Sequence, residues 1–228
     1  MSAVSTTPKP NFAQVFKTEV ITTPQQSVDF MKKFSKIAVS TILYLRTDFD
    51  AGAFKRFKID DVRVTMLTKK QDNLAAGMIL NQISNAMGAL EEGHLKELHL
   101  LFVKSDDPDH IVEMHTLKFD VPKKKAGQSG DEVPLTPKDK ENALRKDLRK
   151  LNKKICYVGQ DLPDLPDNME LRIRLIFSEN TPSGYAPPGY TSASPDTIEK
   201  VRFADVPPTP LSYGKLSTSH HKVQAGVQ

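Results

Sequence analysis

The sequence predicts an α+β domain in which three amphipathic helices pack against a mixed β-sheet. Three stretches repeat apolar residues at three- and four-residue spacing, as helices do when one stripe faces a core. Three other stretches are continuously apolar or alternate apolar with polar residues, as strands do. A chain of 228 residues with 38% hydrophobic content suffices for one well-buried domain, or at most two small ones.

The first helix is expected from Thr23 to about Arg46. Thr23 is a capping residue, Pro24 suits the first helical position, and Gln26 stands where a capping box places its return hydrogen bond. One face of this helix carries a regular apolar stripe, made of Val28, Met31, Phe34, Ile37, Ala38, Thr41, Ile42 and Leu45.

Residues 57–68 alternate enough to predict a short strand or one arm of a hairpin. A second helix follows from about Asp72 to Leu90, and Gly93 is placed to end it. The expected apolar side of this helix consists of Leu74, Met78, Ile83, Met87 and Leu90.

Two strands are predicted next. Leu95–Lys104 is nearly continuously apolar, which is typical of a strand buried on both faces. Ile111–Val121 alternates and is expected to be half-buried, and residues 106–109 supply the turn between the two strands. A loop rich in Pro, Gly, Lys and Ser covers residues 122–136.

Thr136 and Pro137 repeat the pattern of a capping residue followed by proline, so a third helix begins there and ends near Gly159. Its apolar stripe is Leu144, Leu148, Leu151 and Ile155. Met169–Phe177 shows the clearest strand pattern in the chain. Met169, Leu171, Ile173, Leu175 and Phe177 share one face of this strand, and Glu170, Arg172 and Arg174 share the other.

The last fifty residues follow neither a helical nor a strand period for long. Seven of the sixteen prolines lie between Pro182 and Pro210, a composition that alone indicates a disordered tail. The segment also holds more large apolar residues than a solvating linker would: Tyr185, Tyr190, Val201, Phe203, Leu211 and Tyr213. A long irregular segment of this kind is either functional or disordered, and these residues favour a function.

The net charge of +4 is local. Residues 122–160 hold 11 basic and 5 acidic groups, a surplus of six positive charges in one loop and the helix after it. That surplus allows a phosphate-binding surface, whose affinity would fall steeply with salt, but a solvated loop and the wet face of an amphipathic helix are the favoured explanation.

The sequence does not favour an enzyme, a membrane span or a metal site. It has no glycine-rich phosphate loop, no G-x-S-x-G motif and no H-E-x-x-H motif. The single cysteine, Cys156, follows the apolar stripe of the third helix, so we expect a packed core thiol rather than a nucleophile. A lone cysteine also leaves no partner for a disulfide or a cysteine-containing zinc site, and it fits a reducing compartment.

Three segments together resemble the HORMA domain, and within it the meiotic chromosome-axis branch. The first is the helix that ends Tyr44-Leu45-Arg46 with Phe49 after it. The second is Leu171–Phe177 followed by Thr181-Pro182, Tyr185 and Pro187-Pro188-Gly189-Tyr190, a distinctive pattern of that branch. The third runs from Phe203 and Pro207 to Gly214–Thr218 and His220. The order of elements matches over about residues 18–224.

The resemblance implies a HORMA fold: three helices on a mixed, mainly antiparallel sheet with a C-terminal safety belt. It implies a flexible N-terminal arm (1–17), a HORMA core (18–182) and a belt (183–228). HORMA proteins bind a closure-motif peptide as an added strand and wrap the belt over it. By that analogy the peptide-binding strand edge is Glu170, Leu171, Arg172, Ile173, Arg174, Leu175, Ile176 and Phe177. The belt residues are Tyr185, Pro187, Pro188, Gly189, Tyr190, Phe203, Leu211, Tyr213, Gly214 and His220.

The resemblance further implies a non-enzymatic adaptor of the meiotic chromosome axis in the nucleus, without cofactor or metal. Its expected partners are closure motifs of other axis proteins or paralogues, further copies of itself in head-to-tail assembly, and an AAA+ ATPase remodeller that engages the N-terminal arm. The alternatives are a HORMA adaptor of a spindle-checkpoint or DNA-repair branch, and a protein that binds DNA directly through residues 122–160. Direct DNA binding is expected to be weak or absent, and no membrane partner is expected.

Overall fold

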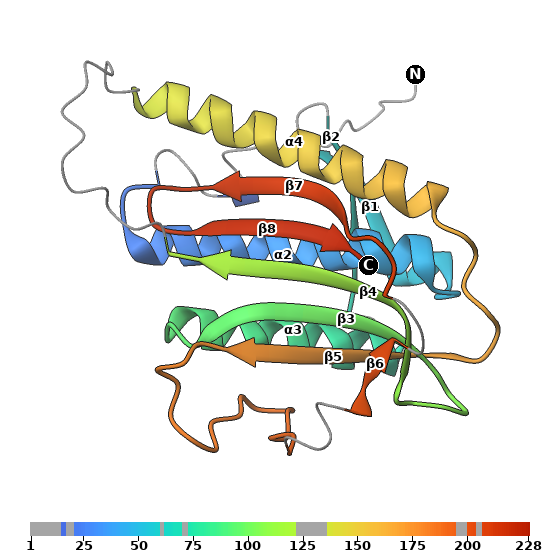
Figure 1. Ribbon diagram of the computed structural model, residues 1–228. Coiled ribbons are helices and arrows are strands. Elements are labelled where there is room, and N and C mark those ends of the chain that lie inside the picture. Colours follow the sequence, from blue (N-terminus) through green and yellow to red (C-terminus); the bar gives the residue numbers. More distant parts are fainter. Residues whose placement is uncertain are drawn as a thin grey trace, which may run out of the picture.

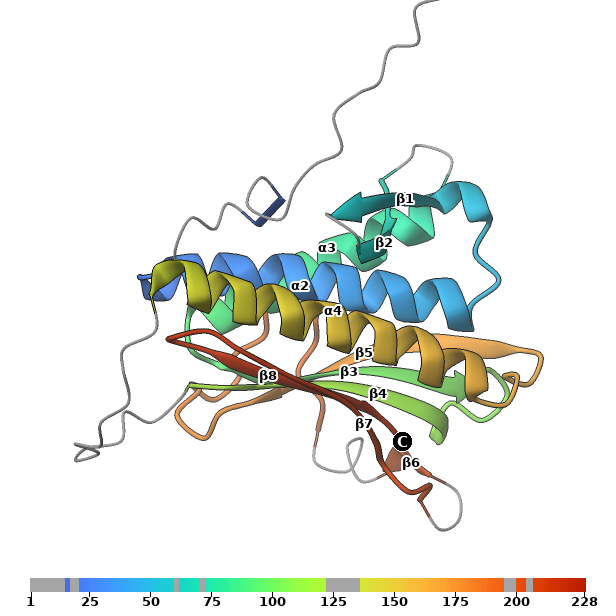
Figure 2. The same ribbon diagram turned by 90° about the horizontal axis from the view of Figure 1, so that it is seen from above.

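A computed structural model describes residues 15–16, 21–59, 62–69, 73–121, 136–194, 200–203 and 207–228. Its centre is a sheet of strand order β5-β3-β4-β8-β7, and the short strand β6 pairs with β4 beside this path. Figure 2 shows that the three long helices of the described residues, α2, α3 and α4, all lie on one face of the sheet. The predicted α+β class, with three helices on a mixed and mainly antiparallel sheet, is confirmed.

The helices begin where their capping sequences predict. Helix α2 spans Pro24–Arg46, and helix α4 spans Pro137–Asp161. Both have complete capping boxes, from Thr23 and Gln26 in α2 and from Thr136 and Asp139 in α4. Within the described residues, no helix is both long enough and apolar enough to cross a membrane.

Helix α3 spans Leu74–Glu91 and buries a different stripe from the predicted one. Leu74 is 80% exposed and Met78 is 65% exposed, so the prediction that both face the core is wrong. The face in contact with the core is rich in alanine, whose small side chain lets a helix approach closely. It consists of Ala76, Ile79, Leu80, Ile83, Ala86, Met87, Ala89 and Leu90.

The central strands follow the prediction closely. Strand β3 (Leu95–Lys104) lies between β5 (Met169–Phe177) and β4 (His110–Asp120), and both pairings are antiparallel. Residues 98–103 of β3 are all buried, as expected of a strand covered on both faces. The expected strand or hairpin arm around residues 57–68 is a separate two-stranded hairpin, formed by β1 (Phe54–Ile59) and β2 (Val62–Leu67).

The C-terminal segment contains strands that the sequence did not indicate. Strand β6 (Arg202–Phe203) runs parallel to β4, whereas β7 (Leu211–Ser217) and β8 (Lys222–Val227) form a hairpin that joins the sheet beside β4. The prediction that no strand period persists here is therefore wrong. The pattern of β7 was hard to recognise because a register shift between Ser212 and Gly214 interrupts its alternation.

The predicted flexible arm (1–17) lies outside the described residues, apart from Val15 and Phe16. Phe16 is only 2% exposed, and its ring centroid lies 4.8 Å from that of Phe30 on α2. Most of the loop predicted over 122–136 also lies outside the described residues.

Candidate functional site

Strand β5 forms one end of the sheet and has a free edge. It pairs with β3 on one side, and no strand of the described residues pairs with its other side. All eight residues predicted as a binding edge, Glu170 to Phe177, lie on this strand. A free edge presents unpaired N–H and C=O groups that can pair with an additional strand. The hairpin of β7 and β8 joins the sheet beside β4, so it leaves the β5 edge uncovered (Figure 1).

The apolar side of β5 faces the helices, as the alternation predicts, but it is incompletely covered. Leu171 and Ile173 are half-buried, whereas their neighbours in β3, Phe102 and Leu100, are about 2% and 1% exposed. Both β5 side chains line a hollow of roughly 1180 Å³ between the sheet, the end of α2, the start of α3 and residues 164–168. A strand added to β5 would place alternate side chains beside this hollow and complete the burial.

The other face of β5 carries the two arginines. The Arg174 guanidinium donates hydrogen bonds to Nδ1 of His99 at 3.1 and 3.3 Å, so His99 is neutral and its Nε2–H donates to Glu97 at 2.9 Å. Burial lowers the pKa of His99, in agreement with this neutral form. Arg172 donates to the carbonyl oxygen of Pro108 at 3.3 Å and pairs with the exposed Glu170 at 3.2 Å.

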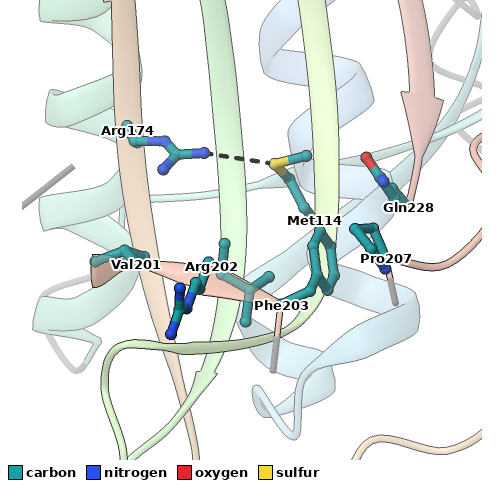
Figure 3. A pocket seen from close by; sticks show the side chains of 8 residues that line it. Met114, Arg174, Val201, Arg202, Phe203, Pro207 and Gln228 are labelled. Atoms are coloured by element: carbon teal, nitrogen blue, oxygen red, sulfur yellow. Dashed lines mark hydrogen bonds between the residues drawn. The ribbon is translucent and has the colours of Figure 1, made fainter. Parts of the chain in front are cut away.

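Strand β6 lies across this second face of the sheet. Val201 and Phe203 pack against a small apolar cluster of Leu101, Val103 and Ile111, separate from the main core. A cavity of roughly 610 Å³ opens beside them, and Figure 3 shows Arg174 extending from β5 toward Met114 at one side of it. The remaining lining residues include Arg202, Pro207 and Gln228.

The sequence motif after β5 forms two consecutive β-turns. The amide of Tyr185 donates to the carbonyl of Pro182, and the amide of Tyr190 donates to the carbonyl of Pro187. The third residue of each turn is a glycine, Gly184 or Gly189, with φ of 79°. This is the type II pattern, which requires a positive φ at that position. We call this segment, residues 182–190, the double turn.

The double turn attaches the chain to α3 and its C-terminal end through three side-chain hydrogen bonds. The hydroxyl of Tyr185 donates to Glu92 at 2.8 Å, and that of Tyr190 donates to the carbonyl of Gln82 at 3.1 Å. The side-chain amide of Asn85 donates to the carbonyl of Pro188 at 2.8 Å. Burial and the hydrogen bond to Glu92 raise the pKa of Tyr185 to about 12, so its hydroxyl stays protonated and remains a donor.

The chain changes sides of the sheet after the double turn. Tyr190 lies on the helix side against α3, whereas Val201 and Phe203 lie on the opposite face. Figure 1 shows the chain leaving the C-terminal end of β5, whereas β6 lies near the opposite end of that strand. Of the predicted belt residues, Tyr190 and Phe203 therefore lie on opposite faces of the sheet, whereas Tyr213 and Gly214 belong to β7, the outer strand farthest from β5.

The C-terminal hairpin is attached to the core by a buried chain of polar groups that we call the latch. The hydroxyl of Tyr213 in β7 donates to Nδ1 of His115 at 2.7 Å, and Nε2–H of His115 donates to Glu113 at 2.6 Å. The Arg46 guanidinium then donates to both oxygens of Glu113, at 2.9 and 2.7 Å, and to the carbonyl of Pro163 at 2.7 Å.

The latch is buried, which sets its protonation states. The side chains of Arg46 and Glu113 are 5% and 9% exposed. Burial lowers the pKa of His115 and raises that of the Tyr213 hydroxyl, so both are neutral. Burial alone would raise the pKa of Glu113, but hydrogen bonds from His115 and Arg46 hold it below the ordinary value.

Sequence reasoning missed most of the latch. Tyr213 was predicted as a belt residue and Arg46 only as part of a family motif. The available signal was the placement of Glu113 and His115 at alternate positions of β4 that are otherwise apolar, since a buried carboxylate requires a cationic partner.

The tip of the hairpin contacts the start of α2. Ser27 Oγ lies 2.7 Å from Nδ1 of His221, and Nε2 of the predicted belt residue His220 bonds the carbonyl of Thr22 at 2.9 Å. Gly214 lies at the register shift in β7 with φ of 133°. Leu211, also among the predicted belt residues, stands at the start of β7 and is 47% exposed.

Within the described part of the chain, no three His, Cys, Asp or Glu side chains are grouped so that they could hold a metal ion. The thiol of Cys156 is half-buried, and burial raises its pKa. The features described above are a free strand edge, two hollows beside it and a segment that passes on both faces of the sheet, and together they are suited to binding an extended peptide.

Comparison with known proteins agrees with this geometry. Residues 27–221 match the family described as HORMA domain. The rat protein named HORMA domain-containing protein 1 is 30% identical over 213 residues, which cover 91% of this chain and 53% of the rat protein. The chain therefore spans about half the length of that relative.

Solved structures show the same fold at lower identity. Caenorhabditis elegans HTP-2 bound to HTP-3 closure motif 1 is 17% identical with a TM-score of 0.76, covering 99% of this chain and 96% of that one. A chain of the mitotic checkpoint complex is 15% identical with a TM-score of 0.66, covering 88% and 97%.

Proposed function

The chain belongs to the HORMA domain family, and on that premise we propose that it is an adaptor that binds a closure-motif peptide as an added strand on β5. The observation that carries this proposal is the free edge of β5, whose inward apolar side chains are only half-buried. An extended peptide would satisfy the outward backbone groups of β5 and cover Leu171 and Ile173. Main-chain hydrogen bonds would contribute affinity, and side-chain hollows would set the register.

The enclosing segment supports a belt over the bound strand. The double turn is fixed to α3 on one side of the sheet, and β6 packs on the other side, so a strand beside β5 would lie within this loop of chain. The latch fixes the end of the belt to β4. Because release would require these contacts to open, we expect slow peptide exchange and a need for an external remodeller such as an AAA+ ATPase.

The relatives and structural neighbours motivate a finer role in the meiotic nucleus. We place the chain at the chromosome axis, where it would join partner axis proteins or further copies of itself through closure motifs. Such assembly would support homolog pairing, synapsis and crossover control without enzymatic activity. HTP-2 in C. elegans is similar in fold and was solved with closure motifs of HTP-3 and HIM-3, which supports peptide binding as the adaptor mechanism.

A library of random linear peptides, screened against the full chain, tests the peptide-binding proposal. Peptides that bind should lose affinity for Leu171→Arg, which places a charge at the helix side of β5. They should keep affinity for the control variant Val121→Arg, which places the same charge at an exposed apolar residue just after β4. Circular dichroism establishes that each variant is folded. Equal binding by both folded variants, or a library that yields no binder, would contradict the proposal.

Direct DNA binding remains a separate candidate because of the basic helix α4. Lys146, Lys150 and Lys153 are exposed on it, and the exposed Tyr157 lies near its end. Titration of duplex DNA at two salt concentrations separates the two functions. We expect weak binding, whereas tight and strongly salt-dependent binding would favour a nucleic-acid role.

A further inference from the structure

The hollow on the helix side of β5 combines an apolar floor with an acidic rim. Met169, Leu171 and Ile173 of β5 form the floor together with Phe102 of β3 and Ile79 of α3. The exposed side chain of Met78 on α3 also lines the hollow and adds apolar surface to it. The floor can therefore cover the aliphatic part of a side chain from an added strand.

Three aspartates line the same hollow: Asp48 after α2, and Asp164 and Asp167 in the segment before β5. All three are exposed, and none forms an ion pair or a side-chain hydrogen bond with the described residues. Their charges are therefore not neutralised by the part of the chain that the structure describes.

Arg46 is the single cationic residue among those that line the hollow. Its guanidinium is committed to both oxygens of Glu113 and to the carbonyl of Pro163, so it does not neutralise the rim. The hollow is thus net negative at its mouth and apolar at its base.

This combination matches one class of side chain. Lysine and arginine cover apolar surface with their aliphatic stems while the charged head stays at the polar boundary. A purely apolar side chain would leave the aspartates unpaired, and an acidic one would be repelled by them. The hollow is also continuous with the β5 edge, where alternate residues of an added strand would point toward the helices.

We propose that the hollow beside Met169–Ile173 selects closure peptides that carry a lysine or arginine on the helix-facing side of the added strand. Asp164 and Asp167 hold the charged head, while Leu171 and Ile173 cover the stem. The inference rests on the proposed function, because it assumes that the peptide adds to β5. It assigns Asp164 and Asp167 as specificity-determining residues.

The test uses the full chain and a display library of random linear peptides longer than the nine residues of β5. The selected peptides should share a lysine or arginine. The comparison peptide has methionine in place of that residue, so it keeps a long apolar side chain but lacks the charge. The double variant Asp164→Lys/Asp167→Lys should weaken the cationic peptide on the order of tenfold at low salt and the methionine peptide little.

The matched control is Asp29→Lys, on the exposed side of α2 and roughly 25 Å along the helix from Arg46. It also adds positive charge to the chain but should leave both peptides bound as in the parent. Equal loss of both peptides in the double variant would overturn the inference alone, as would selected peptides without a common cation. A library without any binder would overturn the proposed function, and this inference with it.

Discussion

The ion pair of Arg46 and Glu113 allows the strongest quantitative prediction, because both side chains are buried and two hydrogen bonds join them. Glutamine in place of Glu113 keeps the size of the side chain but leaves the Arg46 charge without an anion at 5% exposure. Removing one partner of a buried pair costs about 3–5 kcal/mol of unfolding free energy. Because the total free energy of unfolding of a domain is about 5–15 kcal/mol, this substitution would remove a large fraction of it.

Urea unfolding, followed by circular dichroism, measures this loss. With a slope of about 2–3 kcal/mol per molar urea, Glu113→Gln should lower the midpoint by about 1–2.5 M. Glu170→Gln breaks the exposed pair with Arg172 and is the matched control, expected to change stability by less than about 1 kcal/mol. A second control, Arg46→Met together with Glu113→Gln, removes the unpaired charge while keeping an acceptor for His115, and it should recover much of the loss.

A change below about 1 kcal/mol for Glu113→Gln would refute the reasoning, because it would mean that the Arg46 charge is solvated or paired elsewhere. A double variant no more stable than Glu113→Gln would show that packing, rather than an uncompensated charge, sets the cost.

The remaining predictions concern the latch and the double turn. Tyr213→Phe leaves Nδ1 of His115 without its donor, so it should cost about 1–3 kcal/mol and speed amide exchange in the β7–β8 hairpin; unchanged exchange there would contradict the latch. Because burial lowers the pKa of His115, the unfolded chain takes up a proton more readily, so stability should be full above pH 6.5 and fall as the pH drops below it. The fall should be shallower in His115→Gln, and urea midpoints across this range measure it. Gly189→Ala forces a side chain into a positive φ and should cost about 1–2 kcal/mol, whereas Gly77→Ala within α3, where an added Cβ would meet no atom within 4 Å, should not destabilise the chain in the same assay.

The sequence was sufficient to predict the features of the fold that depend on interactions between residues close together in the chain. The capping boxes of α2 and α4 need only residues three apart, so Thr23 and Thr136 located both helix starts correctly. The alternation of β5 likewise assigned its two faces, because side-chain direction in a strand has a period of two. The interpretation failed for Leu74 and Met78, because it gave weight to large side chains where α3 packs through alanine.

The remaining features depend on residues far apart in the chain. Tyr213 and His115 are 98 positions apart, and no local pattern brings them together. Nor does the pattern of β5 show that its edge is free, which follows from β8 pairing with β4. The register shift at Gly214 also hides the strand pattern of the β7–β8 hairpin in the sequence.

Deletion of residues 191–228 would not test the belt alone. Because Tyr213, Leu216 and Val223 belong to the core, this deletion would also destabilise the domain.

Amide hydrogen exchange of the full chain, with and without a library-selected peptide, tests the central claim most directly. The two outer strands, β5 and β7, provide an internal comparison because each pairs with a neighbour on one side of the described sheet. Peptide addition at β5 predicts new protection in residues 169–177 and in the double turn, with β7 unchanged. Protection confined to β7 or to α4, with β5 exchanging as in the free chain, would contradict it.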